Sequence, residues 1–147
     1  MQAKGKILIA EDDKITLQML VDDFSDAGYE VFQYSDGSEV VEMAVKHEPD
    51  LIILDLVMPF VSGYALAGQL KGRPETTHIP IVVVSSTPAT VQNERRKRVQ
   101  HDVILNCVER LEKPVNMPYL LKRVESYIYA GRAVKSINSM QKTVDKL

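Results

Sequence analysis

Carboxylates follow two of the most apolar runs in this sequence of 147 residues. Glu11 and Asp12 directly follow the run KILIA, and Asp55 follows LIIL within the stretch PDLIILDLVMP. A carboxylate is rarely buried among apolar side chains unless a cation or hydrogen-bond donors pair with it. Alone, such an aspartate can be a simple turn or cap residue, but three carboxylates placed in this way indicate a functional site.

Hydroxyl and ammonium groups follow two further short runs. Ser85 and Ser86 come after IPIVVV, and Lys113 comes after VERLE. Carboxylates that lie together repel one another, and one lysine cannot neutralise three of them. A divalent cation can, and oxygen ligands of this kind suit Mg²⁺, or Mn²⁺ in its place. With a cation and Lys113 neutralising phosphoryl oxygens, Asp55 has the chemistry to attack phosphorus and form an aspartyl phosphate.

The elements that must position these residues alternate between short apolar runs and longer amphipathic ones. Strands are predicted at 6–10, 29–34, 50–54, 79–85 and 108–112, and helices at 14–27, 35–47, 62–70, from Thr87 onward and from 115 onward. This alternation predicts an α/β fold, a (βα)5 doubly wound five-stranded parallel sheet with helices on both faces. Working sites in such sheets lie at the carboxyl ends of the strands, where the candidate residues fall.

Composition and charge narrow the class of protein. The sequence is 45% apolar and 26% charged with a formal net charge of −2, which is ordinary for a soluble globular protein. The basic run ERRKR at 94–98 is more typical of a solvated helix face than of a nucleic-acid contact. A single cysteine, Cys107, excludes an internal disulfide framework. Since neither a membrane-spanning run nor a signal-peptide layout is present, we expect a cytoplasmic protein without nucleic-acid or membrane contacts.

Four motifs together resemble the receiver domain of two-component response regulators, in the CheY-like superfamily. They are ILIAEDD, PDLIILDLVMP with Gly63, IPIVVVSS and LEKP, and they span roughly residues 5–130. The resemblance implies that Asp55 is the phosphoacceptor. It also implies a magnesium site in which Asp12 and Asp55 bind directly, Glu11 acts mainly through water and the backbone carbonyl of Val57 is a further ligand.

The same resemblance implies that the remaining residues at the strand ends contact the phosphoryl group. Ser85 matches the switch hydroxyl, Ser86 lies beside it, and Lys113 matches the lysine that contacts the phosphoryl group. The peptide bond between Lys113 and Pro114 is expected to be cis, as is typical of the family. The side chain of Val57 has no polar group to orient an attacking water, which predicts a long-lived phosphoryl group.

Two features depart from the family pattern. Arg110 stands three residues before Lys113, where the family usually has an aromatic switch residue. The usual aromatic switch is therefore not expected here. The segment 86–112 is several residues longer than usual, which predicts a longer helix or an irregular loop.

The resemblance implies a signalling switch and not an enzyme in the ordinary sense. A histidine kinase or phosphotransfer protein would donate the phosphoryl group in a Mg²⁺-dependent reaction, and contacts with a downstream protein effector would change.

Two alternatives share parts of this pattern. A small phosphohydrolase with an aspartyl intermediate would carry its nucleophile after the first strand. A flavodoxin-like cofactor-binding module would need a phosphate loop there, where this chain has the acidic EDDKIT.

The tail is predicted as a separate element. We expect a receiver domain at 1–130 and a C-terminal helical extension or linker at 131–147, with Gly131 as a candidate break. Ile137, Met140, Val144 and Leu147 follow a 3-4-3 spacing that fits a helical seam. Such a seam can dock on the domain, pair with another chain in a homodimer, or lead to an output domain.

Overall fold

Five parallel strands form the centre of the molecule. The computed structural model describes residues 3–86 and 107–146. Its strands are β1 (Lys6–Ala10), β2 (Glu30–Tyr34), β3 (Leu51–Asp55), β4 (Ile81–Ser85) and β5 (Glu109–Glu112), in the order β2-β1-β3-β4-β5. The two central strands β3 and β4 are buried along their whole length, as strands covered on both faces must be. The predicted doubly wound sheet is confirmed.

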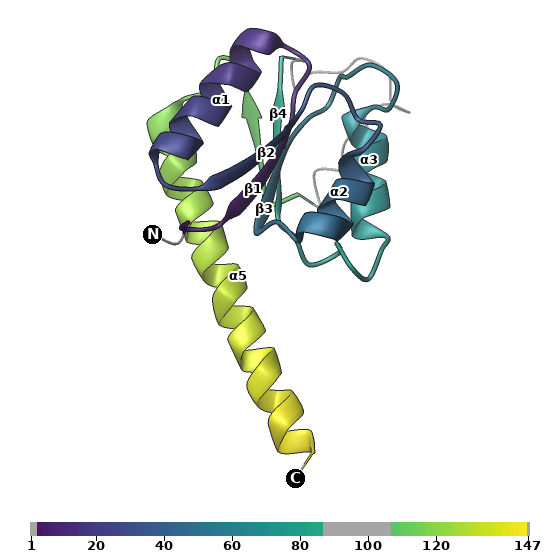
Figure 1. Ribbon diagram of the computed structural model, residues 1–147, viewed down its shortest axis with the longest axis vertical. Helices are drawn as coiled ribbons and strands as arrows, with labels where there is room; N and C mark the ends of the chain where they lie inside the picture. The colour runs from purple at the N-terminus through teal and green to yellow at the C-terminus, as the bar shows by residue number, and fades with distance from the viewer. Residues whose placement is uncertain (1–2, 87–106, 147) are drawn as a thin grey trace.

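Helices cover both faces of this sheet, as Figure 1 shows. On one face, α1 (Lys14–Asp26) and α5 (Met117–Asp145) pack on side chains of β1, β3 and β4 that include Ile7 and Ile53. On the other face, α2 (Val40–His47) and α3 (Gly63–Lys71) pack on the alternate residues, Leu8 and Ile52 among them. Because successive side chains of a strand point to opposite faces, one strand serves two apolar cores.

The second helix begins later than the sequence pattern predicts. The expected helix at 35–47 starts at Val40, because the Asp36 carboxylate accepts a hydrogen bond from the Ser38 amide at 2.8 Å and forms a turn. Gly37 lies in this turn against the loop after β3, where a Cβ atom would come within 2.8 Å of the Val61 carbonyl oxygen. The prediction of a helix start at 35 is therefore wrong by five residues.

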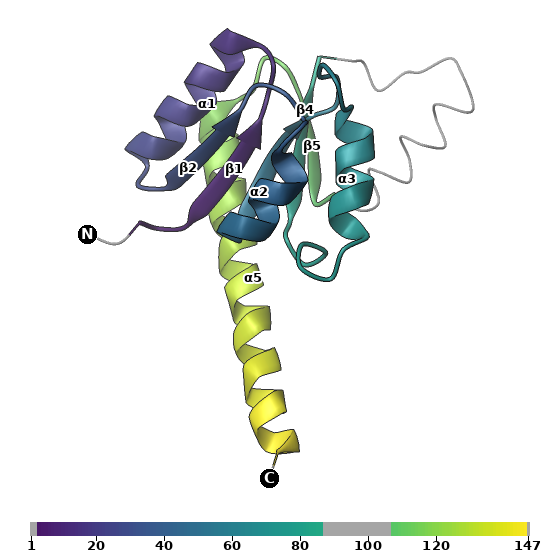
Figure 2. The same ribbon diagram turned by 45° about the vertical axis from the view of Figure 1, so that its right-hand side comes forward.

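The last helix is the longest element and extends well beyond the sheet (Figures 1 and 2). The Asn116 side chain caps its start by accepting from the Tyr119 amide at 3.1 Å. Helix α5 passes through Gly131 without interruption. The predicted break at that residue is therefore wrong, and the helical extension is confirmed. Arg132 contacts the segments that precede β1 and β3, donating to the Lys4 carbonyl at 2.7 Å and lying 3.7 Å from the Asp50 carboxylate.

Several predictions fall outside the part of the chain that the structure describes. The helix expected from Thr87, the basic run at 94–98, most of the lengthened segment 86–112 and Leu147 are among them. Of the helices formed by residues 3–86 and 107–146, none is long and apolar enough to cross a membrane. The domain boundary at residue 130 stays a prediction.

Candidate functional site

Three carboxylates meet at the carboxyl edge of the sheet. β1 leads directly into Glu11 and Asp12, and Asp55 is the last residue of the neighbouring strand β3. One carboxylate oxygen from each of these three residues lies within 4.8 Å of the others. Glu11 and Asp55 are buried, while Asp12 is exposed to solvent. The cluster is thus closed on its inner side and open on its outer side, as a site that admits a ligand must be.

Lys113 brings a positive charge into this cluster. It follows β5, and its ammonium group donates to the Glu11 carboxylate and lies 3.3 Å from Oδ2 of Asp55. Its own amide donates to the carbonyl of Ser85 at 3.0 Å, which fixes the chain beside the end of β4. The bond between Lys113 and Pro114 is cis, so that prediction is confirmed.

The loop after β3 fixes the position of Asp55. The Val57 amide donates to Oδ1 of Asp55 at 3.2 Å, and the Gly63 amide donates to the Leu56 carbonyl at 3.0 Å. A Cβ atom at Gly63 would lie 2.0 Å from the carbonyl oxygen of Asp55, far inside contact distance. The loop can therefore close on Asp55 only with glycine at this position.

The remaining candidate residues lie at different depths. Ser85 ends β4 fully buried, next to the position that Asp55 occupies on β3, while Ser86 is exposed just beyond the strand. The side chain of Val57 is 60% exposed at the outer edge of the site. Arg110 lies half-buried within β5, where Val83 of β4 is its register partner.

Burial and repulsion shape the protonation of the cluster. Burial raises the pKa of Glu11 from 4.5 to about 8, although its bond with Lys113 acts in the opposite direction. Burial and a hydrogen bond with Asp55 also raise the pKa of Asp12. Burial alone would lower the pKa of Lys113, but its contacts with Glu11 and Asp55 together raise it. Without a cation, Glu11 and Asp12 therefore hold protons more tightly than carboxylates in water.

Asp13 has a different role from its two acidic neighbours. Its carboxylate caps α1 by accepting from the Thr16 amide at 3.3 Å. The hydrogen bonds with Thr16 lower its pKa. Asp13 therefore serves as the N-cap of α1, while Glu11, Asp12 and Asp55 make up the acidic cluster.

A second polar cluster, which the sequence analysis missed, joins β5 to α5. The Glu109 carboxylate accepts from the hydroxyls of Tyr119 and Tyr127 and from Nε of Arg123, the last two at 2.7 and 3.1 Å. The three donors are spaced four residues apart, which places them on one face of α5. A helical projection of the sequence would have shown this grouping of donors. Their acceptor could not be found in this way, because it lies on a separate element.

Exposed apolar side chains around the acidic cluster were also missed. Ile15 in the first turn of α1 is 82% exposed, and Phe60 in the loop after β3 is 89% exposed. Phe60 also has a positive φ of 69°, which is rare for a bulky residue. Together with Val57, these side chains make up an apolar rim, carried by the segments that directly follow Asp12 and Asp55.

Comparison with known proteins agrees with this geometry. Residues 7–125 match the family model of the response regulator receiver domain. The chain is 29% identical over 122 residues to the polar-differentiation response regulator DivK of Brucella anthropi, an alignment that covers 83% of this chain and 94% of that protein.

Solved structures show the same fold. The signal receiver domain of a signal transduction histidine kinase from Syntrophus aciditrophicus is 28% identical with a TM-score of 0.74, covering 86% of this chain and 91% of that one. The receiver domain of a sensor histidine kinase from Pseudomonas aeruginosa, solved with a magnesium ion coordinated in its active-site cleft, is 22% identical with a TM-score of 0.73, over 86% of this chain and 98% of that one. The chain belongs to the response regulator receiver domain family of two-component signalling, whose members are signalling switches rather than phosphohydrolases or flavodoxin-like cofactor binders.

Proposed function

We propose that Asp55 accepts a phosphoryl group from a phosphohistidine of a sensor histidine kinase or phosphotransfer protein. The observation that carries this proposal is the convergence of three carboxylates with Lys113, whose ammonium group lies 3.3 Å from Oδ2 of Asp55. A carboxylate oxygen of Asp55 forms the new bond to phosphorus. The bond between phosphorus and the donor's imidazole nitrogen breaks, and the imidazole leaves with the electron pair.

The acidic cluster suits a magnesium ion, with manganese as a substitute. Asp12 and Asp55 would supply carboxylate oxygens, the Val57 carbonyl a third ligand, and Glu11 a contact through water. The residues fit a hard cation, because all of them offer oxygen atoms and the negative charge of three carboxylates exceeds the charge of Lys113. When bound, the ion neutralises phosphoryl oxygens during the transfer.

Lys113, Ser85 and Ser86 would hold the transferred group. A phosphoryl group on Asp55 adds a charge of roughly −1.5 to −2 and several strong acceptor oxygens. Lys113 already contacts Asp55 and donates to it without a large rearrangement. The hydroxyls of Ser85 and Ser86 at the end of β4 supply neutral donors, with the buried Ser85 as the one whose rotation reports phosphorylation to the rest of the sheet.

The apolar rim supports docking of the phosphodonor. Ile15, Val57 and Phe60 are exposed to 82%, 60% and 89% and lie in the segments that directly follow Asp12 and Asp55. A partner that covers them gains apolar burial and excludes water from the transfer. Signalling then follows from changed contacts with a downstream protein, and we place the chain in the cytoplasm with such partners.

Mass spectrometry after incubation with Mg²⁺ and a small phosphodonor such as acetyl phosphate tests this proposal. We expect one phosphoryl group per chain, lost when Mg²⁺ is chelated and absent in Asp55→Asn. Asp13→Asn is the matched control, because it removes a nearby carboxylate by the same exchange while asparagine still caps α1. Modification that survives Asp55→Asn, or that needs no divalent cation, contradicts the proposal.

A further inference from the structure

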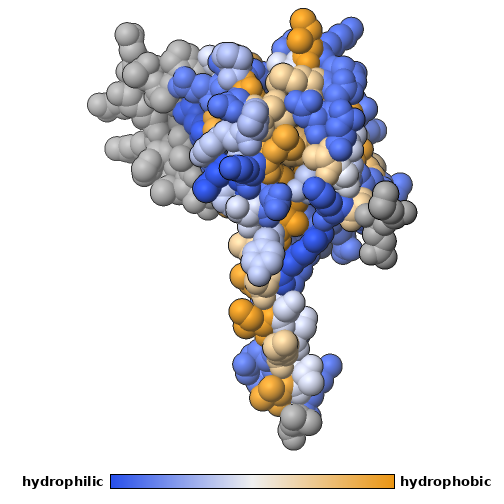
Figure 3. Space-filling view, turned by 90° about the vertical axis from the view of Figure 1, so that its left-hand side faces the viewer, coloured by the Kyte–Doolittle hydropathy of each residue, from blue (hydrophilic) through white to orange (hydrophobic). Residues whose placement is uncertain are grey.

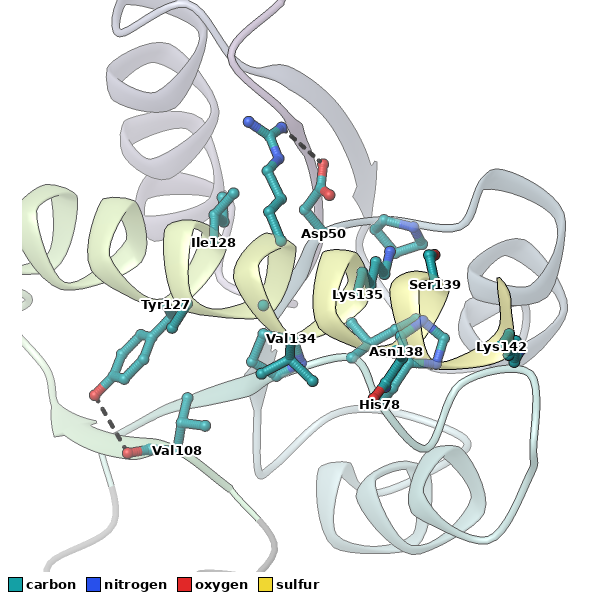
Figure 4. A pocket seen from close by; sticks show the side chains of 16 residues that line it. Asp50, His78, Val108, Tyr127, Ile128, Val134, Lys135, Asn138, Ser139 and Lys142 are labelled. Carbon is teal, nitrogen blue, oxygen red and sulfur yellow. Dashed lines mark hydrogen bonds and ion pairs between the residues drawn. The ribbon is translucent and has the colours of Figure 1, made fainter. Parts of the chain in front are cut away.

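The C-terminal part of α5, residues 132–145, forms a helical arm that extends away from the sheet (Figures 1 and 2). Within the domain, α5 buries Met117, Leu120, Val124 and Ile128, spaced three or four residues apart. The same spacing continues into the arm through Gly131, Lys135, Asn138 and Lys142. These four line a pocket of about 590 Å³ between α5 and the loops that precede β3 and β4 (Figure 4). The side of the arm that faces its own domain therefore carries Lys135, Asn138, Ser139 and Lys142, with Val134 as an apolar side chain among them.

The opposite side of the arm is apolar. Ile137, Met140 and Val144 are 63%, 68% and 60% exposed, and none of the three lines the pocket. Figure 3 shows apolar side chains along the arm. An amphipathic helix that folded onto its own domain would present this stripe inward and its lysines outward. The observed orientation is the reverse, so the stripe is exposed to solvent and available for contact with another molecule.

We propose that the stripe pairs with the same stripe of a second copy of this chain, in a parallel two-stranded coiled coil. In heptad notation Ile137 and Val144 occupy position a, and Met140 occupies position d. β-branched residues at a, together with leucine at d, favour two parallel strands, and the similarly long apolar Met140 stands at d here. Ala130, which also borders the pocket, and Ala133 continue the a and d positions toward the domain, where small side chains let two helices approach closely.

The residues beside the stripe favour an identical partner. Positions e and g of these heptads hold only uncharged residues: Tyr129, Val134, Ser136, Gln141 and Thr143. A different partner helix is usually selected by complementary charges at these positions. Here no such charges exist to select one, and two identical helices meet without like-charge repulsion. The lysines of the arm lie on the pocket side, away from the pairing face.

The fold leaves room for this arrangement and limits its strength. Because the stripe faces away from the pocket side, the two domains lie on the outer sides of the helix pair. One heptad before Ala130, position a is Arg123, which contacts Glu109 and Tyr127 of its own domain, so pairing is confined to the residues from Ala130 onward. A seam of about 15 residues is about 22 Å long. An interface of this size is small and predicts an equilibrium that depends on concentration.

Sedimentation equilibrium of the unmodified full chain tests the proposal. We expect the average mass to rise from the monomer value of 16.5 kDa toward twice that value as concentration increases. Met140→Glu should weaken the association at least about tenfold, because a charge enters the seam. Asn138→Glu introduces the same residue on the pocket side and should leave the association unchanged. Circular dichroism confirms that both variants fold.

Disulfide cross-linking checks the register. In a Cys107→Ala background, Ile137→Cys should form an intermolecular disulfide because parallel pairing places residue 137 beside its counterpart, whereas Asn138→Cys should not. A chain that stays monomeric at every concentration, because its stripe is covered in another way or fits a different protein, overturns the proposal. Equal weakening by Asn138→Glu, or equal cross-linking at residue 138, overturns it as well. No phosphorylation is needed, so the outcome does not depend on the role of Asp55.

Discussion

Gly63 lies directly against the main chain of Asp55. A Cβ atom at Gly63 would approach the Asp55 carbonyl oxygen to 2.0 Å and the Leu56 α-carbon to 2.7 Å. Both neighbours are backbone atoms, which cannot rotate out of the way as a side chain can. The position of the proposed phosphoacceptor therefore depends on the absence of a side chain eight residues later.

Replacement of Gly63 by alanine should lower the free energy of unfolding by about 3 kcal/mol, because the loop must move away from β3. Urea unfolding followed by circular dichroism measures this change. Gly68→Ala is the control in the same helix, since an added Cβ atom there meets nothing within 4 Å. That variant should gain about 0.5–1 kcal/mol from improved helix propensity. A Gly63→Ala variant as stable as the wild type would contradict the observed packing.

The raised pKa of Glu11 predicts how stability depends on pH. Folded Glu11 keeps its proton up to a pKa of about 8, whereas the unfolded chain releases it near 4.5. Between these values the folded state binds more protons, so the unfolding free energy of the metal-free protein should fall as pH rises. Mg²⁺ requires the ionised carboxylate, and its affinity should rise over the same range.

Glu11→Gln isolates this effect from other titrating groups. His78, whose pKa burial lowers, contributes in the opposite direction, but it contributes equally to both proteins. The difference between wild type and Glu11→Gln should therefore slope downward between about pH 5 and 8. Unfolding free energies in a chelator, measured at several pH values, give this difference. A difference that is constant with pH would show that Glu11 titrates normally.

The exposed side chain of Val57 predicts a long-lived phosphoryl group. Val57 lies two residues after Asp55 and is 60% exposed, where a polar group would contact an incoming water. Val57→Asn should increase the autodephosphorylation rate several-fold, because an amide can orient that water for attack. Val57→Leu keeps the position apolar and should leave the rate close to that of the wild type. The decay of the phosphorylated protein, followed by mass spectrometry, distinguishes them.

Glu109 should stabilise the junction between β5 and α5. Its hydrogen bonds with Tyr119, Tyr127 and Arg123 together outweigh the effect of burial and lower its pKa. Glu109→Ala leaves these donors without their shared acceptor and should cost about 1–2 kcal/mol of unfolding free energy at neutral pH. Tyr119→Phe removes a single bond and should cost less.

The pH dependence of this variant has a defined sign. Because the pKa of Glu109 is lowered, its contribution is complete above the usual value of 4.5 and is lost as pH falls through its folded value. Chemical unfolding at neutral and acidic pH measures the difference between wild type and Glu109→Ala. An undiminished difference in acid would show that the carboxylate charge is not what holds α5.

The sheet and the acidic cluster could be predicted because their signals are local. Each strand is a short apolar run, and the topology of a parallel sheet brings the residues after these runs to one edge. Glu11, Asp12, Asp55 and Lys113 are found together there for that reason. The cis bond before Pro114 followed from the family resemblance and could not be derived from spacing.

Other features depend on contacts that the sequence pattern does not contain. The start of α2 moved to Val40 because a side chain of the turn, Asp36, competes for a backbone amide. Helix α5 continues through Gly131 because the low helix propensity of a single glycine is outweighed by the helical residues on both sides of it. The bonds to Glu109 cross between elements, so neither helical nor strand periodicity reveals them.

Strand β5 has only four residues, and both of its ends carry contacts. Glu109 begins the strand and accepts a hydrogen bond from Arg123 of α5. Lys113 directly follows the strand and forms ion pairs with Glu11 and Asp55. An extended strand of this length spans about 13 Å and cannot stretch, so a shift of Lys113 is transmitted to the foot of the helix. The arm beyond Gly131 is a helix about 20 Å long. If the whole helix tilts by 5°, the C-terminal end of the arm moves by about 2 Å. Small movements at the acidic cluster are thereby magnified at the far end of the molecule.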